Sequence, residues 1–426
     1  MVPSVDGRLA ILATLLISFA VITALRRPPL PPGPVPLPLI GNVLSIDAKE
    51  PWLTYTRWRA VYGDLVFVRI LDQDAVVINS QHVAQALMDK RSRIYSDRPY
   101  LATVKPYGWS INFAFIAYGD EWRLSRRLFH QTFRPESAVK FRPIQMRRAR
   151  EMIVNLIDEP QHYHTHFATS AILSARDDPL VRIAEHAQAL GLVMLTPEES
   201  NFAQTFPFLL KLPDWCWGSS IKRDAQASTN ALNEMADVQL RRSANEQTNI
   251  VCCSTSSQTT STLMAFAFAM MSYPDVQRRA QAEIDSVVGR DRLPTFEDRA
   301  SLPYVESVLR ETWRWHPIVP LGATVICNTW SDIFSPVVET LTLYCRSISR
   351  DEKRYPEAFR FMPERFIDVN GRYAADASVW SAIVTMLATD DQGNVINFTP
   401  QFTTGLVQYV VSLCHYILQS LTLPSL

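Results

Sequence analysis

The sequence predicts a mainly α-helical protein with a small β-sheet. Glycine is scarce, at 13 of 426 residues, while proline is plentiful at 28, which fits helices joined by proline-containing connections better than a β-sandwich. From about Gln81 onward the apolar residues mostly recur at helical spacing, whereas residues 65–79 alternate like strands. With 47% hydrophobic residues the chain can bury a large core, as one large domain or as two to three ordinary ones.

The charge balance and the cysteines argue against several classes of protein. Lys plus Arg and Asp plus Glu are equal at 42 each, so no basic field attracts nucleic acid and no acidic tail suggests a cationic partner. None of the six cysteines forms a Cys-x-x-Cys pair or another paired spacing. Reduced cytosolic thiols are therefore expected, rather than a disulfide framework or a zinc site.

Residues 1–27 are predicted to form an N-terminal transmembrane anchor. Leu9 to Leu25 is a 17-residue stretch without a charge, which as a helix would span about 26 Å, near the lower limit for crossing a bilayer. The alternative, a cleaved signal peptide, has a shorter apolar run and a small-residue cleavage site, whereas basic residues and prolines follow here. Arg26 and Arg27 favour a cytosolic position for the domain that follows.

Residues 28–41 are predicted to form a proline-rich strut. Seven of the eleven residues from Pro28 to Pro38 are proline. Proline fixes its own φ and restricts the residue before it, so the segment cannot be helical and should be stiff and extended.

Two strands and several helices are predicted in the remainder, residues 42–426. Residues 65–79 should form two short strands around an Asp-Gln-Asp turn. Residues 263–271 are apolar on every side, as in a helix through a domain centre, and are too few for a second membrane span. Residues 274–289 have proline at a helix start and glycine just past its end.

The next helix, which opens at Ser301 and Pro303 and runs to the residue before Pro317, carries the first informative motif. Glu311 and Arg314 are three residues apart, on one helix face, where a carboxylate and a guanidinium can pair. The later motif Pro363-Glu-Arg-Phe366 supplies a second arginine, Arg365. One acid with two bidentate cations forms a network that can lock a helix to a loop, and this role is structural rather than catalytic.

These two motifs, in this order, resemble the cytochrome P-450 family, the haem-thiolate monooxygenases, and especially its fungal microsomal members. The resemblance covers nearly the whole chain, including the anchor, the proline segment and the Gly41-Asn42 that closes it. It implies the cytochrome P-450-like fold, a haem (iron protoporphyrin IX) cofactor, and electrons from NADPH through NADPH-cytochrome reductase. It further implies a single-pass protein of the endoplasmic reticulum membrane with a cytosolic catalytic domain, residues 42–426. The expected reaction inserts one oxygen atom from O2 into an apolar small molecule, in secondary or xenobiotic metabolism.

The resemblance also assigns two residues to haem binding. Gly119 to Phe129 matches the Trp-x-x-x-Arg helix of the family, with Trp122 and Arg126 four residues apart on one face. An aromatic N–H and a cation at these places can hold a haem propionate. The alternative is an ordinary amphipathic surface helix.

The central helix departs from the family pattern. The family places an acid and an alcohol over the iron for proton relay, and here Thr259 or Thr260 supplies the hydroxyl while Gln258 stands where the acid is expected. Glutamine cannot release a proton, so a relay through this position needs water or another group. A polar cap in an apolar helix is the alternative.

The main departure follows Phe366. The family has a Phe-x-x-Gly-x-Arg-x-Cys-x-Gly loop whose cysteine binds the haem iron, but this chain runs from Gly371 directly into Arg372, where the next family helix should begin. The axial cysteine is therefore predicted to be absent, and the fold to be incomplete near 371–372. The tail 406–426 is also atypical of the family.

Residues 331–345 are predicted to be an insertion. Removing them joins Trp330 to Arg346 in a sequence that reads like the family. A gain here and losses elsewhere leave two explanations open: a gene model with missed exons and a retained intron, or a genuinely degenerate gene.

Trp109, Phe113 and Phe115 precede the Trp122 helix, where the family builds part of its substrate wall. They are candidate residues of an apolar substrate pocket, and core packing is the alternative. Two other functions also stay open: an inactive pseudoenzyme or mis-spliced remnant, and a membrane-tethered non-enzymatic binding module.

Overall fold

The computed structural model describes fifteen parts of the chain. These are residues 30–47, 50–71, 73–91, 95, 97–111, 115–133, 139–171, 179–194, 203–213, 215–216, 219–242, 246–317, 324–326, 340–343 and 345–368. The predicted anchor 1–27, the junction near 371–372 and the tail 406–426 lie outside them. None of the helices in these parts is long and apolar enough to cross a bilayer.

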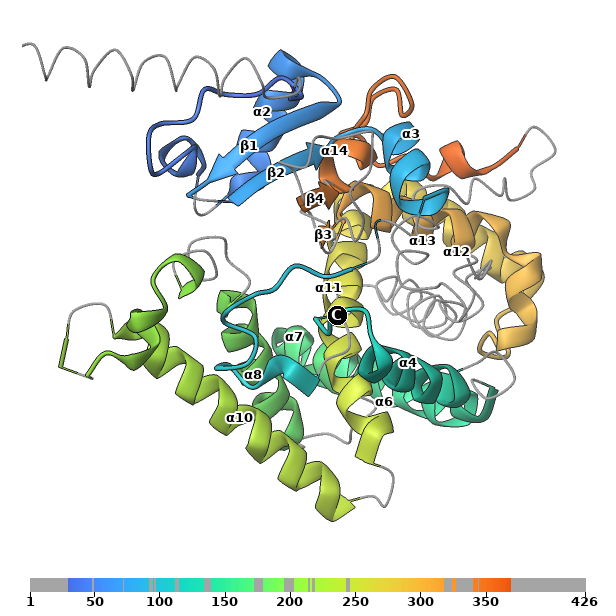
Figure 1. Ribbon diagram of the computed structural model, residues 1–426. Helices are drawn as coiled ribbons and strands as arrows, with labels where there is room; N and C mark the ends of the chain where they lie inside the picture. Colours follow the sequence, from blue (N-terminus) through green and yellow to red (C-terminus); the bar gives the residue numbers. More distant parts are fainter. Residues whose placement is uncertain are drawn as a thin grey trace, which may run out of the picture.

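The fold is mainly helical with one small sheet, as predicted (Figure 1). The described helices are α2 (Pro51–Tyr62), α3 (Gln81–Ala84), α4 (Asp120–Phe133), α6 (Arg142–Asp158), α7 (Tyr163–Ala171), α8 (Pro179–Met194), α10 (Ser220–Arg242), α11 (Glu246–Ser272), α12 (Pro274–Val287), α13 (Pro303–Trp315) and α14 (Cys345–Ser349). Short helical turns are η1 (Val43–Ser45), η2 (Gln85–Asp89), η3 (Trp109–Ile111), η4 (Val139–Phe141), η5 (Pro160–His162), η6 (Pro207–Lys211), η7 (Phe296–Ser301) and η8 (Pro363–Phe366).

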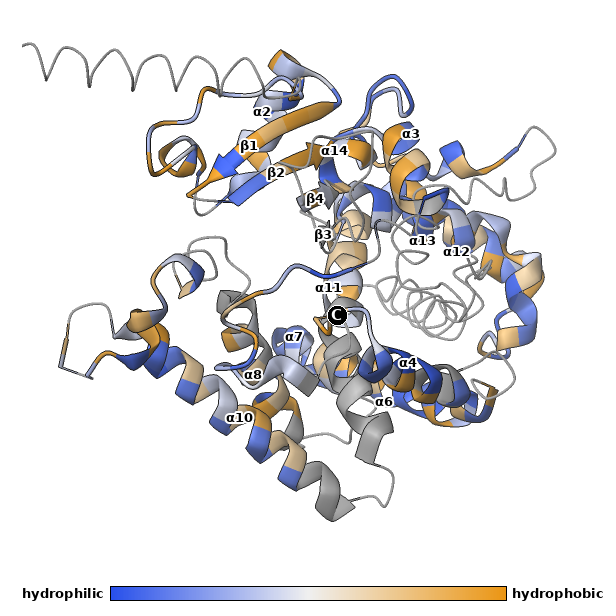
Figure 2. Ribbon diagram, viewed as in Figure 1, coloured by the Kyte–Doolittle hydropathy of each residue, from blue (hydrophilic) through white to orange (hydrophobic). Residues whose placement is uncertain are grey.

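The sheet has four strands in the order β1-β2-β4-β3. The expected pair is β1 (Leu65–Ile70) and β2 (Gln73–Ile78), which are antiparallel, and their hydrophobic residues stand out in Figure 2. On the other side, β2 pairs in parallel with β4 (Thr340–Leu343), and β4 pairs with β3 (Thr324–Ile326) in antiparallel fashion. β4 lies within the predicted insertion 331–345, so part of that segment is an inner strand of the sheet.

The buried hydrophobic residues of the described parts form five clusters, and two of them surround the elements that carry the motifs. The larger joins α6, α7, α11, α12 and α13, with Phe167, Phe266, Ile284 and Leu309 buried in it. The second lies between the sheet, α3, η2 and α14. α11 runs through the middle of the molecule between these regions (Figure 1), which agrees with the apolar stretch 263–271.

The helix boundaries follow local sequence signals. α12 begins at Pro274 and its chain reverses at Gly289, which has a positive φ. α13 begins at Pro303, two residues later than Ser301, because Ser301 is the last residue of η7, a turn that starts with a capping box between Thr295 and Asp298. Both helices place one apolar face in the larger cluster.

The proline-rich segment is less extended than the strut predicted for 28–41. It is extended to Pro36, then makes a turn in which Leu37 and Gly41 exchange both backbone hydrogen bonds at 2.9 Å. The turn is tied to β1, because Asn42 N donates to Arg69 O and Arg69 N donates to the Asn42 Oδ1. Proline content excludes a helix but carries no signal for this docking.

Candidate functional site

Glu311 and Arg314 form a bidentate ion pair inside the protein. Arg314 Nε donates to Glu311 Oε2 at 2.6 Å and Nη2 donates to Oε1 at 2.7 Å. Both side chains are completely enclosed. Burial raises the pKa of Glu311, against the opposing effect of the hydrogen bonds from Arg314. The pair that the helix spacing predicted is therefore formed, and away from water.

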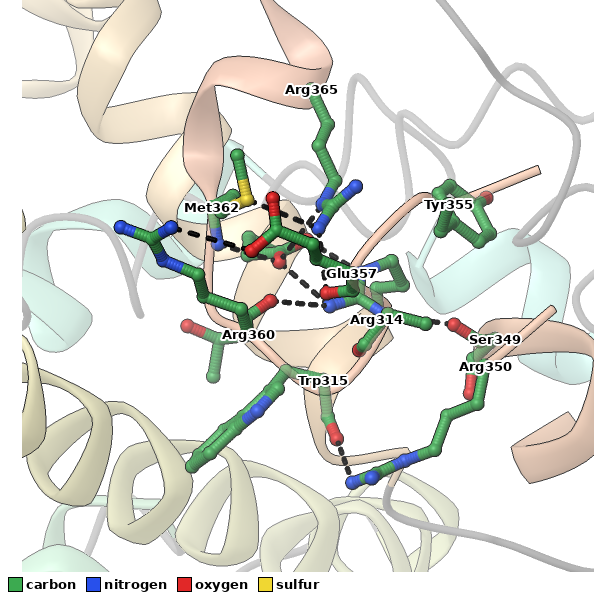
Figure 3. A network of polar contacts seen from close by, with 12 residues as sticks. Arg314, Trp315, Ser349, Arg350, Tyr355, Glu357, Arg360, Met362 and Arg365 are labelled. Carbon is green, nitrogen blue, oxygen red and sulfur yellow. Dashed lines mark hydrogen bonds and ion pairs between the residues drawn. The ribbon is translucent and has the colours of Figure 1, made fainter. Parts of the chain in front are cut away.

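Arg314 also joins α13 to two later segments (Figure 3). Its Nη1 donates to the carbonyls of Ser349 and Ala358, each at 2.8 Å, and its Nη2 donates to Arg360 O at 3.2 Å. The ring of Tyr355 lies against the guanidinium, 5.3 Å from centroid to Cζ. One side chain thus holds the end of α14 and the segment before η8.

Arg365 completes the cluster. Its Nε lies 3.6 Å from Glu311 Oε1, an ion pair that is longer than a hydrogen bond, and its Nη2 donates to Glu357 O at 2.9 Å. Glu311 Oε1 also accepts the backbone N–H of Met362 at 2.8 Å. The acid and the two arginines that sequence spacing singled out therefore meet, and the carboxylate has contacts from both arginines and the backbone.

Sequence reasoning missed a second link to η8. Glu364 accepts the Tyr304 hydroxyl at 3.1 Å and forms an ion pair with Arg279 of α12. The Arg279 guanidinium in turn stacks on the Tyr304 ring, 4.5 Å from its centroid. Nothing in the spacing of these residues indicates the contact, because it joins three separate elements.

The predicted propionate residues lie on α4. Trp122 is half-buried with its ring 5.2 Å from that of Tyr118, and burial lowers the pKa of Arg126 to about 10. Burial also lowers the pKa of Arg98, an arginine that sequence reasoning missed. Asp97 Oδ1 accepts the backbone N–H groups of Arg98 and Tyr118, which holds this segment against the start of α4. Poorly hydrated guanidiniums here suit an anionic group such as a carboxylate.

Thr259 and Thr260 are both buried on α11, at the end of a run of polar residues, 254–262, that precedes the apolar stretch 263–271. A buried hydroxyl in the central helix is what the proton-relay prediction requires. The side chain of Gln258 lies outside the described residues.

Trp109 is wedged between two helices. Its Nε1 donates to Ser228 Oγ of α10 at 3.2 Å, and its ring lies so close to Gly191 of α8 that a Cβ there would sit 2.3 Å from Cζ2. Phe115 packs edge-on at 6.4 Å between ring centroids, while Phe113 lies outside the described residues. For Trp109 these contacts favour core packing over a pocket lining.

The described cysteines do not supply the expected iron ligand. Cys345 begins α14 and is buried in the sheet-side cluster, where burial raises the pKa of its thiol to about 12. Cys345 also precedes η8 in the chain, whereas the family's ligand loop follows that motif. Cys216 is partly exposed between η6 and α10. The ligand loop of the family should follow η8, and Cys216 lies far from η8 along the chain. The charge of the half-buried Arg126 is the kind that a haem propionate requires, but neither of these two cysteines fits the axial position.

Comparison with known proteins gives the same assignment. The family model described as Cytochrome P450 matches residues 31–174 and 225–379. Cytochrome P450 monooxygenase 226 of Postia placenta is 32% identical, over 87% of this chain and 83% of its own length. Cytochrome P450 monooxygenase COX1 of Coprinopsis cinerea is 31% identical, over 84% and 80%.

One alignment also shows that this chain lacks residues that a relative has. Cytochrome P450 monooxygenase 176 of Postia placenta is 28% identical over 472 positions, which is more than the 426 residues of this chain. That relative therefore has internal residues without a counterpart here. With its buried acid–arginine network and its match to the family model over most of its length, the chain belongs to the cytochrome P450 family.

Proposed function

We propose that this protein inserts one oxygen atom from O2 into an apolar small molecule. Members of the cytochrome P450 family are haem-dependent monooxygenases that take electrons from a reductase. Because the chain belongs to this family, haem dependence and a reductase partner follow from its membership. The observation that carries the proposal is the enclosed network of Glu311, Arg314 and Arg365, which holds α13 to η8 just before the expected ligand loop. A brace at this place would fix the segment from which the family presents its haem ligand.

Individual residues receive roles by their placement. Trp122 and Arg126 would hold a haem propionate, through an N–H and a cation on one side of α4. Thr259 or Thr260 would hold a proton at its hydroxyl oxygen beside bound substrate. Bound haem would supply the oxygen chemistry, although neither Cys216 nor Cys345 fits as its ligand.

An apolar substrate is supported by the side chains near the expected wall. Phe115 packs with Trp109, Val104 and Leu210 around the buried Tyr107. An apolar molecule would gain by leaving water for such surroundings.

The membrane location is proposed from the sequence run Leu9–Leu25 and from exposed apolar residues elsewhere in the chain. We place the protein in the endoplasmic reticulum membrane, with residues 1–27 as a single span and the catalytic domain in the cytosol beside NADPH-cytochrome reductase. Phe208 on η6 and Trp215, four residues after its end, have exposed aromatic side chains, which water solvates poorly.

One observation favours a second candidate, an inactive pseudoenzyme. Cys345, one of the two cysteines whose side chains the structure describes, is buried in the sheet-side cluster and precedes η8 instead of following it. Without the ligand loop the network would survive as a structural remnant. A membrane-tethered binding module is a third reading, and it would not require the Glu311 network.

The test is the absorbance of the purified full chain after reduction and carbon monoxide. A thiolate-type spectrum supports the monooxygenase, whereas a colourless folded protein supports the pseudoenzyme. Arg126→Leu should lower haem retention and Arg127→Leu, exposed on the same helix, should not. Sequencing the transcript across the Gly371–Arg372 junction complements this: an uninterrupted junction in the mature message would eliminate the gene-model explanation.

A further inference from the structure

Aromatic side chains gather where α11, α13 and the segment before η8 meet. Trp315, the last residue of α13, stacks on Phe268 of α11 with 5.8 Å between the ring centroids. It also packs edge-on against Tyr273 and Phe361, at 6.1 and 5.7 Å between centroids. Its Nε1 donates to Phe359 O at 2.8 Å. One tryptophan therefore joins the three elements.

The outer side of these rings is an apolar surface, which we call the aromatic face and define as Phe268, Met271, Trp315 and Phe359. Phe268 is 56% exposed, Met271 69% and Phe359 64%. Phe268 and Met271 are three residues apart and so lie on one side of α11. The Arg350 guanidinium lies on the Phe359 ring, 4.7 Å from its centroid, and its Nη2 donates to Trp315 O at 3.1 Å (Figure 3). Apolar side chains that are held in place and gathered on one surface indicate a docking site.

The tail 406–426 has the sequence pattern of a helix with one apolar side. No Asp, Glu, Lys or Arg occurs in it. Its apolar residues recur every three to four positions in two adjacent rows: Leu406, Val410, Leu413 and Ile417, and Val407, Val411, Cys414, Leu418 and Leu421. The opposite row is polar: Gln408, Ser412, His415, Gln419 and Thr422. The spacing predicts an amphipathic helix over residues 406–421.

This pattern suits a protein surface better than a membrane. A helix that spans a bilayer is apolar on every side, and a helix that lies in the membrane surface has Lys and Arg along its polar side. The polar row of residues 406–421 has neither cation. Such a helix is expected to bury its apolar side against protein, and the aromatic face has the matching character.

The described chain also ends beside the aromatic face. η8 ends at Phe366, and Ile367 packs against the same hydrophobic cluster as Trp315 and Tyr273. Residues 369–405 separate this point from Leu406, and a segment of that length spans up to about 120 Å when extended. The length of chain therefore allows the tail to return to this face.

We propose that residues 406–421 form a helix whose apolar side packs on the aromatic face. The tail then covers from outside the segment before η8 that Arg314 holds from inside through Ala358 O and Arg360 O. This contact goes beyond the proposed function, because it requires neither bound haem nor a membrane.

The first experiment uses Cys414, which belongs to the apolar rows of the tail. In the full chain in phosphatidylcholine vesicles, Met271→Cys and Phe359→Cys should each form an intramolecular disulfide with Cys414 under mild oxidation. The yield should be several-fold higher than for Ile157→Cys, which is exposed on α6, because a disulfide needs Cα atoms within about 7 Å. Peptide mass spectrometry identifies the pair, and a non-reducing gel separates bonds within one chain from bonds between chains.

Three results of this experiment would overturn the proposal. One is an equal yield at positions 271, 359 and 157, and another is no disulfide with Cys414 at either position of the aromatic face. The third is a disulfide that forms only between two copies of the chain, which would make the face an interface between copies.

The second experiment measures the oxidation of Met271 by hydrogen peroxide in two charge variants of the tail. Val410→Asp with Ile417→Asp places two charges on the apolar side and should accelerate the oxidation several-fold. Gln408→Asp with His415→Asp places two acidic side chains on the polar row and should leave the rate at that of the parent chain. Met152, which is buried in the larger cluster, should stay slow throughout and reports that the fold is intact. The same Met271 rate in the parent and both variants would show that the tail does not cover this face.

Discussion

Arg314 Nη1 donates a hydrogen bond to the carbonyl of Ala358 at 2.8 Å, across 44 residues of chain. The contact lies in the interior. The same Nη1 also donates to Ser349 O, while Nε and Nη2 donate to the Glu311 carboxylate and Nη2 donates to Arg360 O as well. The path of the chain before η8 is therefore fixed by one side chain of α13.

Replacing Glu311 by Ala should destabilise the fold by about 3–5 kcal/mol, because it leaves two inward-facing arginines without their acid. Soluble yield and the midpoint of urea unfolding measure the effect. The matched control is Glu357→Ala, whose ion pair with Arg360 is exposed and should contribute about 0–1 kcal/mol. Equal midpoints for the two variants would contradict the bracing role.

Replacing Gly191 by Ala should destabilise by about 1–3 kcal/mol, because the new methyl group meets the Trp109 ring. His186→Ala, exposed on the same helix, should stay within about 0.5 kcal/mol. Thermal unfolding compares the two. If Gly191→Ala is tolerated, Trp109 can move, and its role as a pocket lining regains support.

The Cys345 thiol should react slowly with a thiol reagent in the folded protein up to about pH 9, because burial raises its pKa to about 12. Unfolding in denaturant should accelerate the reaction at this position, which mass spectrometry of the labelled peptide reports. Cys345→Ser should also leave any haem spectrum unchanged. A spectrum that depends on Cys345 would show that this thiol reaches the iron.

Deleting residues 331–344 should weaken the fold, because β4 is paired on both sides in the sheet. The variant joins Trp330 to Cys345, and soluble yield with circular dichroism tests it. Higher yield and a more cooperative melt than the parent chain would instead mark the segment as an insertion that the fold does not need.

His316 should make the fold less stable in mild acid. Burial and the charges of Arg346 and Arg350 lower the pKa of its imidazole. Below about pH 6.5 the unfolded chain takes up a proton that the folded imidazole resists, so stability is complete above that pH and falls as the pH decreases. His316→Gln should narrow the difference in melting temperature between pH 8 and pH 5, and parallel curves would refute the assignment.

The sequence predicted those parts of the fold whose signals are local. Alternation marks β1 and β2, Pro303 marks the start of α13, and the three-residue spacing of Glu311 and Arg314 predicts their pairing. These features depend on neighbours within a few residues, for which side-chain direction is set by the backbone.

Features that depend on distant partners were not predicted. The pairing of β4 with β2, the Tyr304–Glu364 hydrogen bond and the docking of Asn42 on β1 each join separate elements. The burial of Arg98 was missed for the same reason. For Trp109 the sequence could not distinguish two roles, because an aromatic residue before a helix has the same pattern whether it lines a pocket or fills a core.

The pairing of β2 with β4 has a consequence for synthesis on the ribosome. Val76 and Val77 lie opposite Leu341 and Thr342, so most of the chain must be translated before that side of β2 is covered. At about 5–20 residues per second, the strand edge waits on the order of tens of seconds. An uncovered apolar edge is a template for aggregation, so the nascent chain should need a chaperone during this interval.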